Sequence, residues 1–391
     1  MKPTVIIIGK AEIINLTLSR CLGELGYRII VIHIVRSTRM RVKPLDYYSK
    51  YVYNYYCSKA EDLVKMLIEK CVDKDHKPIV FPLDDASVYI IDQSLSRLKD
   101  YFLFANVENK DGAVSRLMNK SVQRRIATKA GLNVAKGWEI PYVNGEYVIP
   151  EDIEYPCFLK GELCFATLKK FQKKCNDEKE LRSVLDESRE SFLNPFPFIA
   201  EEYLKIDEEI GFMGISDGDN SRIPIMVEKI ENGKGTTNGV TMLARLFFME
   251  DDNEITTSLS RFLSELNYFG ITNFDLAVCN GKLYFLEVNF RYAAYGYAAC
   301  LAGINLPEMF VKLITGECIQ SSNENTNVNK LFFNEKVGAR SILERFISWK
   351  KYREMDKMAD YKAIKSKDDP RPYYHFLIQY FLRYIRTRLL G

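Results

Sequence analysis

The chain is poor in histidine and in patterned cysteine, which excludes several common kinds of site. Its 391 residues include three histidines, and none of them lies near a pair of cysteines. The nine cysteines form no C-x-x-C pair and show no regular spacing. A zinc site is therefore not predicted. The odd, unpatterned set of cysteines indicates free thiols and a location in the reducing cytosol.

Long apolar runs and a strong net charge are also missing. No stretch of about 20 apolar residues is present, so the sequence predicts no membrane-spanning helix. The opening residues, MKPTVIIIG, are typical of a first strand that enters a glycine turn rather than of a signal peptide. A net charge of +3 gives no reason to expect a nucleic-acid partner. Positive charge gathers in residues 341–391, which hold twelve Lys or Arg against six Asp or Glu.

The first 110 residues alternate between patterns of buried strands and of amphipathic helices. Strands are expected over 5–8, 28–34 and 78–82, and helices over 12–25, 61–71 and 87–98. This alternation predicts a parallel sheet with right-handed crossovers. The first turn lacks a G-x-G-x-x-G fingerprint, which counts against a nicotinamide-dependent oxidoreductase. Asp84 and Asp85, at a strand end, either face a substrate or cap the next helix.

Further strand and helix patterns follow. Helices are expected over 118–130, 258–266 and 298–316, and strands over 155–160, 198–204 and 224–230. Residues 231–239 hold three glycines in a polar run, which predicts a mobile loop. The Asn-rich residues 321–329 predict a linker or surface loop.

The most informative stretch is 273–291, in which two apolar runs flank Asn280-Gly281, a pair typical of a type I′ hairpin turn. Asp275 lies before the turn, and Glu287 and Asn289 lie after it, so strand pairing can bring these oxygen-bearing side chains together. Such hard oxygens suit Mg²⁺ bound with a nucleotide. Arg291 adds a cation for a phosphate or carboxylate. An ordinary surface hairpin is the alternative, but an ionised Glu287 in an apolar, largely buried strand is costly unless paired or metal-bound.

Three segments, taken in order, resemble the ATP-grasp superfamily, and the resemblance runs from the N-terminus to about residue 320. They are YPCFLK at 155–160, IAEEYL at 199–204 and FDLAVCNGKLYFLEVNFR at 274–291. AGINLP at 302–307 and DPRP at 369–372 look like segments of the carbamoyl-phosphate-synthase-like and D-aspartate-ligase-like amino-acid ligases.

The resemblance implies an α/β chain with the α+β ATP-grasp fold. A parallel-sheet domain is expected at 1–112 and an ATP-grasp domain at 113–320. The latter divides into a small lid subdomain at 113–198 and a metal-binding subdomain at 199–320. A C-terminal helical extension is expected at 321–391.

The resemblance also assigns roles to single residues. The residues implied for ATP are the phosphate-binding Lys120 and Lys160, the adenine-binding Glu201 with the backbones of Glu202 and Leu204, and the ribose-binding Glu209, for which Glu208 is the competitor. The implied ligands of Mg²⁺, or of Mn²⁺, are Asp275, Glu287 and Asn289. Lys229 is implied as a third lysine on the triphosphate, and Arg291 as the residue that steadies the transferred phosphoryl group.

The implied activity is an ATP-dependent ligase that joins a small-molecule carboxylate to an amine through an acyl phosphate. A departure in the glycine loop keeps a non-catalytic binding or scaffold protein as the alternative. The loop after Lys160 has one glycine, Gly161, followed by Glu162, whereas many members have several glycines there. Residues 292–295, YAAY, replace a small, glycine-containing segment next to the substrate.

Residues 373–390 predict a basic, aromatic-rich amphipathic helix. Such a helix can lie on the anionic inner face of a membrane, which would favour a cell-envelope or polysaccharide-linked substrate. Alternatively, it docks on its own protein or on a homodimer partner.

Overall fold

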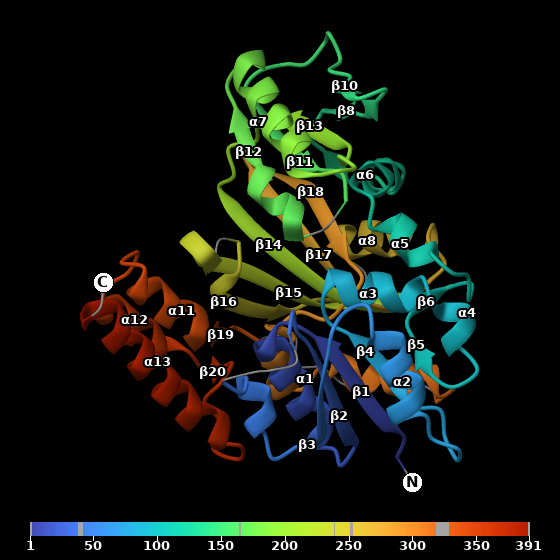
Figure 1. The fold of residues 1–391 in the computed structure, drawn as a ribbon, viewed down its shortest axis with the longest axis vertical. Coiled ribbons are helices and arrows are strands. Elements are labelled where there is room, and N and C mark those ends of the chain that lie inside the picture. The colour runs from blue at the N-terminus through green and yellow to red at the C-terminus, as the bar shows by residue number, and fades with distance from the viewer. Residues whose placement is uncertain are drawn as a thin grey trace.

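The computed structural model describes residues 2–37, 42–163, 166–237, 239–250, 253–317 and 328–389. Two large sheets and a smaller one organise these residues (Figure 1). Most of the linker expected at 321–329 lies outside the described residues.

The N-terminal domain contains a five-stranded sheet in the order β3-β2-β1-β4-β5 whose paired strands are all parallel, as the alternating pattern predicts. Its elements are β1 (Thr4–Gly9), α1 (Glu12–Gly23), β2 (Arg28–Ile34), β3 (Val52–Ser58), α2 (Leu63–Cys71), β4 (Ile79–Pro82), α3 (Asp85–Asp92), α4 (Leu95–Leu98) and β5 (Leu103–Phe104). Val5 and Ile7 of β1 pack in one core with α1, while Ile6 and Ile8 pack in another with α2 and α4. Strand β3 was not predicted, because its residues are mostly half-buried and lack a clear apolar alternation.

The second large sheet carries the hairpin. Its main strands are β14 (Glu208–Asp217), β15 (Ser221–Asn232), β16 (Thr241–Phe248), β17 (Tyr268–Cys279) and β18 (Lys282–Asn289), in the order β16-β15-β14-β17-β18. Asn280 and Gly281 both have positive φ, 51° and 73°, as the predicted turn requires. Asp275 pairs with Glu287 across the hairpin, so the expected meeting of these side chains is confirmed.

The lid subdomain is a separate four-stranded sheet, at the top of Figure 1. It consists of β8 (Gly137–Ile140), β11 (Cys157–Gly161), β12 (Lys173–Cys175) and β13 (Phe198–Glu202), and it shares a core with α7 (Glu178–Ser191). Strand β13 crosses the boundary expected at 198, because it pairs with β11 and β8. Helices α5 (Ala113–Leu117) and α6 (Lys120–Lys129) contribute instead to the core of the large sheet, with α8 (Glu254–Ser264). The lid therefore starts later and ends later than expected.

The C-terminal extension is not only helical, which corrects the sequence-based expectation. Strands β19 (Lys330–Phe333) and β20 (Tyr361–Lys362) extend the large sheet beyond β16. Three helices accompany them, α11 (Glu335–Leu343), α12 (Trp349–Met358) and α13 (Arg371–Leu389). Phe332 and Phe333 are 1% and 0% exposed, so this extension completes the core of the protein.

The helical region expected at 298–316 divides into α9 (Gly296–Ala302) and α10 (Leu306–Ile314), with Gly303 at a φ of 118° between them. Among the residues described, no single helix has the length and apolar character needed to cross a membrane. Helices α9 and α10 meet these criteria of length and apolar character only when they are taken together, and the angle between them is 89°.

A buried ion pair fastens the C-terminal extension to the N-terminal domain. Arg20 of α1 and Asp369 are 0% and 1% exposed, and their Nε and Oδ2 atoms lie 3.0 Å apart. Arg20 also donates to the carbonyls of Ala363 and Ile364, at 3.0 and 2.8 Å. The Ser49 hydroxyl donates to the same carboxylate at 2.7 Å. Both charged groups, the Arg20 guanidinium and the Asp369 carboxylate, therefore have a counter-charge and further hydrogen-bond partners.

We expect Asp369→Ala to lower the free energy of unfolding by about 3–5 kcal/mol, because it leaves the Arg20 guanidinium buried without a counter-charge. Denaturant unfolding measures the change. Asp368→Ala, at the exposed neighbouring carboxylate, is the matched control and should leave the midpoint nearly unchanged. Equal midpoints for the two variants would show that the pair contributes little.

Helix α13 packs against its own protein through one face, which is one of the alternatives that the sequence left open. Phe376 is 6% exposed and belongs to the core. The opposite face is open to solvent: Leu377, Ile378, Phe381 and Leu382 are 43 to 61% exposed. The contacts with the rest of the chain thus account for one side of this helix only.

Candidate active site

The expected metal ligands lie together on β17 and β18. The Asn289 amide donates to Asp275 Oδ2 at 3.1 Å, across the hairpin from Glu287. Lys229 Nζ of β15 lies 2.6 Å from Asp275 Oδ1, and Lys120 Nζ of α6 lies 3.0 Å from Glu287 Oε2. The side chain of Glu287 is 32% exposed, so it is less buried than its apolar strand predicted. Four elements therefore place two carboxylates and two ammonium groups around one point.

This donor set fits Mg²⁺. Each carboxylate already attracts a cationic side chain, so the site favours positive charge. Within the described part of the chain, no group of three or more His, Cys, Asp or Glu side chains could hold a metal. Two carboxylates with one amide oxygen suit a cation that keeps several waters and takes further oxygens from nucleotide phosphates.

Lys229 is held in its charged form. Burial alone would lower its pKa, but the carboxylate of Asp275 outweighs that effect, and the pKa is raised above its ordinary value. Lys229 thus brings a permanent positive charge to the metal-binding residues at neutral pH.

Arg291 follows β18 and joins the site to the N-terminal domain. Its Nε donates to Asp85 Oδ1 at 2.8 Å, and its terminal nitrogen donates to Asn289 Oδ1 at 3.3 Å. Burial opposes the charge, but Asp85 outweighs it and raises the pKa of Arg291. Asp84 instead caps a helix: its side chain accepts a hydrogen bond from the backbone N–H of Ser87 at the start of α3. Asp85 is therefore a site residue, and Asp84 a helix cap.

Strand alternation separates Glu209 from its competitor Glu208. Glu209 lies opposite Lys229 in the sheet, with 3.8 Å between its Oε2 and Lys229 Nζ. Its Oε2 also accepts a hydrogen bond of 3.0 Å from Asn232. Glu208 is exposed, and the alternation turns it to the opposite face. Of the two, Glu209 is the one that belongs to the site.

The residues expected to bind adenine form a second cluster in the lid. Glu201 of β13 contacts Lys160 of β11 at 2.5 Å and Arg124 of α6 at 2.8 Å, one cation on each carboxylate oxygen. The Glu202 backbone N–H donates to the Lys136 carbonyl at 2.8 Å. Leu204 lies two residues beyond the end of β13. The structure thus pairs Lys160 directly with Glu201, and Arg124 is a neighbour that sequence reasoning missed.

Two side chains near Arg291 were also missed. The Tyr295 hydroxyl donates to Asn273 Oδ1, and Tyr295 lies against Gly211, where an added Cβ would come within 2.7 Å of the hydroxyl oxygen. Burial raises the pKa of Tyr295 above its ordinary value, so the hydroxyl keeps its proton. A sequence signal existed for Asn273, which precedes Asp275 by two residues and so shares its face of the strand.

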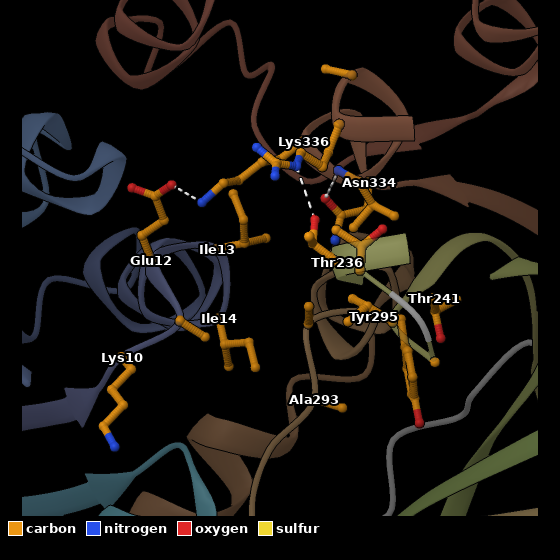
Figure 2. Close-up of a pocket in the computed structure, with 18 of the residues that line it drawn as sticks. Lys10, Glu12, Ile13, Ile14, Thr236, Thr241, Ala293, Tyr295, Asn334 and Lys336 are labelled. Carbon is orange, nitrogen blue, oxygen red and sulfur yellow. Dashed lines mark hydrogen bonds and ion pairs between the residues drawn. The ribbon is translucent and has the colours of Figure 1, made fainter. Parts of the chain in front are cut away.

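One cavity of about 550 Å³ opens next to these residues, and Lys229, Asp275, Glu287, Asn289 and Arg291 line one part of it. In Figure 2, residues of α1, among them Glu12, Ile13 and Ile14, lie across the cavity from Thr236, Thr241 and Tyr295. The cavity therefore lies between the N-terminal domain, the hairpin sheet and the C-terminal extension.

No family model matches the chain. It is 27% identical over 130 residues to the carbamoyl phosphate synthase large chain of Buchnera aphidicola, a match of 32% of this chain and 12% of that one. It is 26% identical over 200 residues to the C-terminal section of the same enzyme from Aquifex aeolicus, covering 46% of this chain and 36% of the relative. The chain thus spans little more than a third, at most, of these relatives.

Solved structures are similar over most of the chain. The biotin carboxylase domain of Hydrogenobacter thermophilus 2-oxoglutarate carboxylase, with MgADP, ADP and bicarbonate, matches with a TM-score of 0.63 at 15% identity, over 85% of this chain and 74% of that one. An L-amino acid ligase from Bacillus licheniformis matches with a TM-score of 0.60 at 14% identity, over 84% and 79%.

N5-carboxyaminoimidazole synthetase from Staphylococcus aureus, in complex with ADP, matches with a TM-score of 0.61 at 16% identity, over 85% of this chain and 82% of that one. These likenesses establish the fold. The chain has the ATP-grasp fold of these enzymes, and part of its sequence is similar to the carbamoyl phosphate synthase large chain.

Proposed function

We propose that the chain is an ATP-dependent carboxylate–amine ligase that releases ADP and phosphate. One observation carries this proposal: Asp275, Glu287 and Asn289 meet the cations Lys229 and Arg291 beside a cavity large enough for a substrate. Oxygen ligands for Mg²⁺ next to fixed cations are what phosphoryl transfer to a carboxylate requires.

In the proposed reaction, a carboxylate oxygen bonds to the γ-phosphorus of ATP while the bond to the ADP oxygen breaks. The amine nitrogen then bonds to the acyl carbon, phosphate leaves with the electron pair of the C–O bond, and the amine loses a proton. Bound Mg²⁺ would offset charge on the phosphate oxygens. Arg291, which Asp85 and Asn289 orient, would hold the carboxylate against the phosphoryl group. Lys229 adds a second fixed cation.

The first test is a phosphate-release screen with Mg-ATP over small carboxylates and amines, combined with titration of ADP with and without Mg²⁺. A ligase should release phosphate only when an accepted carboxylate is present and should bind ADP more tightly with the metal. If the metal leaves the affinity for ADP unchanged and no carboxylate stimulates phosphate release, the non-catalytic binding protein is the better account.

The nicotinamide-dependent alternative is disfavoured by the first turn. The backbone N–H of Lys10 donates to Asp84 Oδ2 at 2.8 Å. In dinucleotide-binding proteins the corresponding amides face the pyrophosphate. Here a carboxylate already lies at that position, and Glu12 adds a second one in the first turn of α1.

We further propose that the exposed face of α13 binds an anionic membrane. Leu377, Ile378, Phe381 and Leu382 form its apolar side, and the exposed Arg371 and Arg386 supply the complementary charge. We expect the protein to sediment with vesicles that contain phosphatidylserine and much less with phosphatidylcholine alone. The double variant Ile378→Glu/Phe381→Glu should remove that difference, whereas Val148→Glu, an equally exposed apolar position in the lid, should not. Equal sedimentation with both kinds of vesicle would contradict the proposal.

A further inference from the structure

The cavity extends well beyond the reactive residues Asp275, Glu287 and Arg291. Its far part, lined by residues of α1, β19, α11 and α13, is formed by segments outside the ATP-grasp domain expected at 113–320. The C-terminal helices α11 and α13 form one wall. The start of α1 forms another, on which Glu12 and Ile13 lie close to Lys336 of α11 (Figure 2). We propose that this far part binds the body of the carboxylate substrate, and that the substrate is an organic acid with an apolar body and no cationic group. The inference rests on the proposed ligase function.

The size of the cavity favours a substrate larger than a very small acid. At about 550 Å³ the cavity has the volume of a site for a drug-sized molecule. A bicarbonate or acetate ion held at Arg291 would leave most of this space to water. An acid with a longer body would fill it and replace that water with protein contacts.

The lining of the far part is mainly apolar. Its residues come from four different elements: Ile13 and Ile14 from α1, Phe332 from β19, Val337 and Leu343 from α11, and Phe376 from α13. Transfer of a hydrocarbon body from water to such a surface is favourable in proportion to the area buried. The far part therefore selects for an apolar carbon body rather than for a hydroxylated one.

The charges on the lining explain why the substrate should carry no cation. Six cationic side chains line the cavity, together with three carboxylates, those of Glu12, Asp275 and Glu287. Each carboxylate already pairs with a lysine, since Glu12 contacts Lys336 (Figure 2), Asp275 contacts Lys229 and Glu287 contacts Lys120. A substrate ammonium would find no carboxylate left among the described lining residues and would face a surplus of positive charge.

Polar contacts hold the far wall in place before any substrate binds. Arg340 of α11 donates to the Thr236 hydroxyl at 2.9 Å, and the Thr236 backbone N–H donates to Glu344 at 3.1 Å. Gln379 of α13 donates to the Lys43 carbonyl at 3.0 Å. The loop predicted to be mobile thus contacts α11 through Thr236. Because the wall is fixed, the cavity imposes a shape on its ligand, and affinity should follow how much of the ligand is buried.

The test is calorimetric titration of the full chain, with Mg-ADP present, using straight-chain carboxylates from acetate to octanoate. We expect the affinity to rise about fourfold for each methylene that the cavity buries. Octanedioate should bind at least about tenfold more tightly than the octanoate that carries an amine at its far end. Leu343→Glu should remove the dependence on chain length, whereas Leu301→Glu, in α9 away from the cavity, should keep it.

Three results would overturn the inference: affinity that does not change with chain length, equal binding of the dioate and the amino acid, or no effect of Leu343→Glu. Failure of the ligase function looks different. In that case Mg-ADP gives no heat of binding or no carboxylate stimulates phosphate release, while the chain-length series still reports on the cavity.

Discussion

Replacement of Glu287 by glutamine should lower the rate of ADP release by about 10³-fold, because a metal ion supplies several kcal/mol of transition-state stabilisation and Glu287 is one of the two carboxylate ligands proposed for it. The variant keeps the shape of the side chain and removes only its charge. The measurement is ADP formation in a coupled assay with an accepted carboxylate, together with the Mg²⁺ dependence of ADP binding. We expect both the rate and the metal dependence to fall.

Glu228→Gln is the matched control for this variant. Glu228 lies on β15 of the same sheet, its side chain is 30% exposed against 32% for Glu287, and it likewise pairs with one cation, Arg245. Turnover of the Glu228 variant should remain near that of the parent chain. Full turnover in the Glu287 variant, with the control also active, would remove the hairpin from the metal site.

Arg291→Lys should lower the turnover rate by about 10³-fold, at the lower end of what an arginine that stabilises a phosphoryl-transfer transition state contributes. The lysine keeps the charge but cannot reach both Asp85 and Asn289 with one planar group. The loss should appear in kcat for the carboxylate, and the affinity for Mg-ADP should change little. Steady-state kinetics and nucleotide titration separate the two effects.

Arg245→Lys, at a surface pair of 2.9 Å with Glu228, makes the same exchange outside the site and should leave kcat unchanged. Should the Arg291 variant weaken Mg-ADP binding instead of kcat, Arg291 would be a nucleotide ligand rather than a residue that acts on the transferred group.

The hairpin was the part of the site most accessible to sequence reasoning. The Asn280-Gly281 turn predicts the hairpin, the period-two spacing predicts the shared face of Glu287 and Asn289, and the structure has both. The register at Asp275 was not predictable in this way, because an irregularity between Asp275 and Leu276 brings Asp275 opposite Glu287. Local rules suffice for the turn and for the shared face, because strand alternation and turn geometry are properties of short segments. The cap formed by Asp84 is also local, since Ser87 is three residues away, but the contact of Asp85 depends on Arg291, which lies more than 200 residues away.

The far wall of the cavity lay beyond those rules. The segments 330–333 and 361–362 are short. The first forms a strand by pairing with the edge of β16, and the second by pairing with the first. The apolar face of α13 was visible in the sequence, but the pattern could not say which of its apolar residues would be buried. The structure buries Phe376 and leaves Phe381 61% exposed, a division set by packing against the rest of the chain.

The contact between Arg20 and Asp369 also bears on how the protein is made. The two residues are 349 positions apart, so the first is synthesised near the beginning and the second near the end. At about 5–20 residues per second, roughly 20–70 s separate their appearance on a ribosome. During that time α1 carries a cation whose partner has not yet been made. We therefore expect the N-terminal domain to reach its final stability only when translation is nearly complete, and a polypeptide released early to be left with an incomplete core.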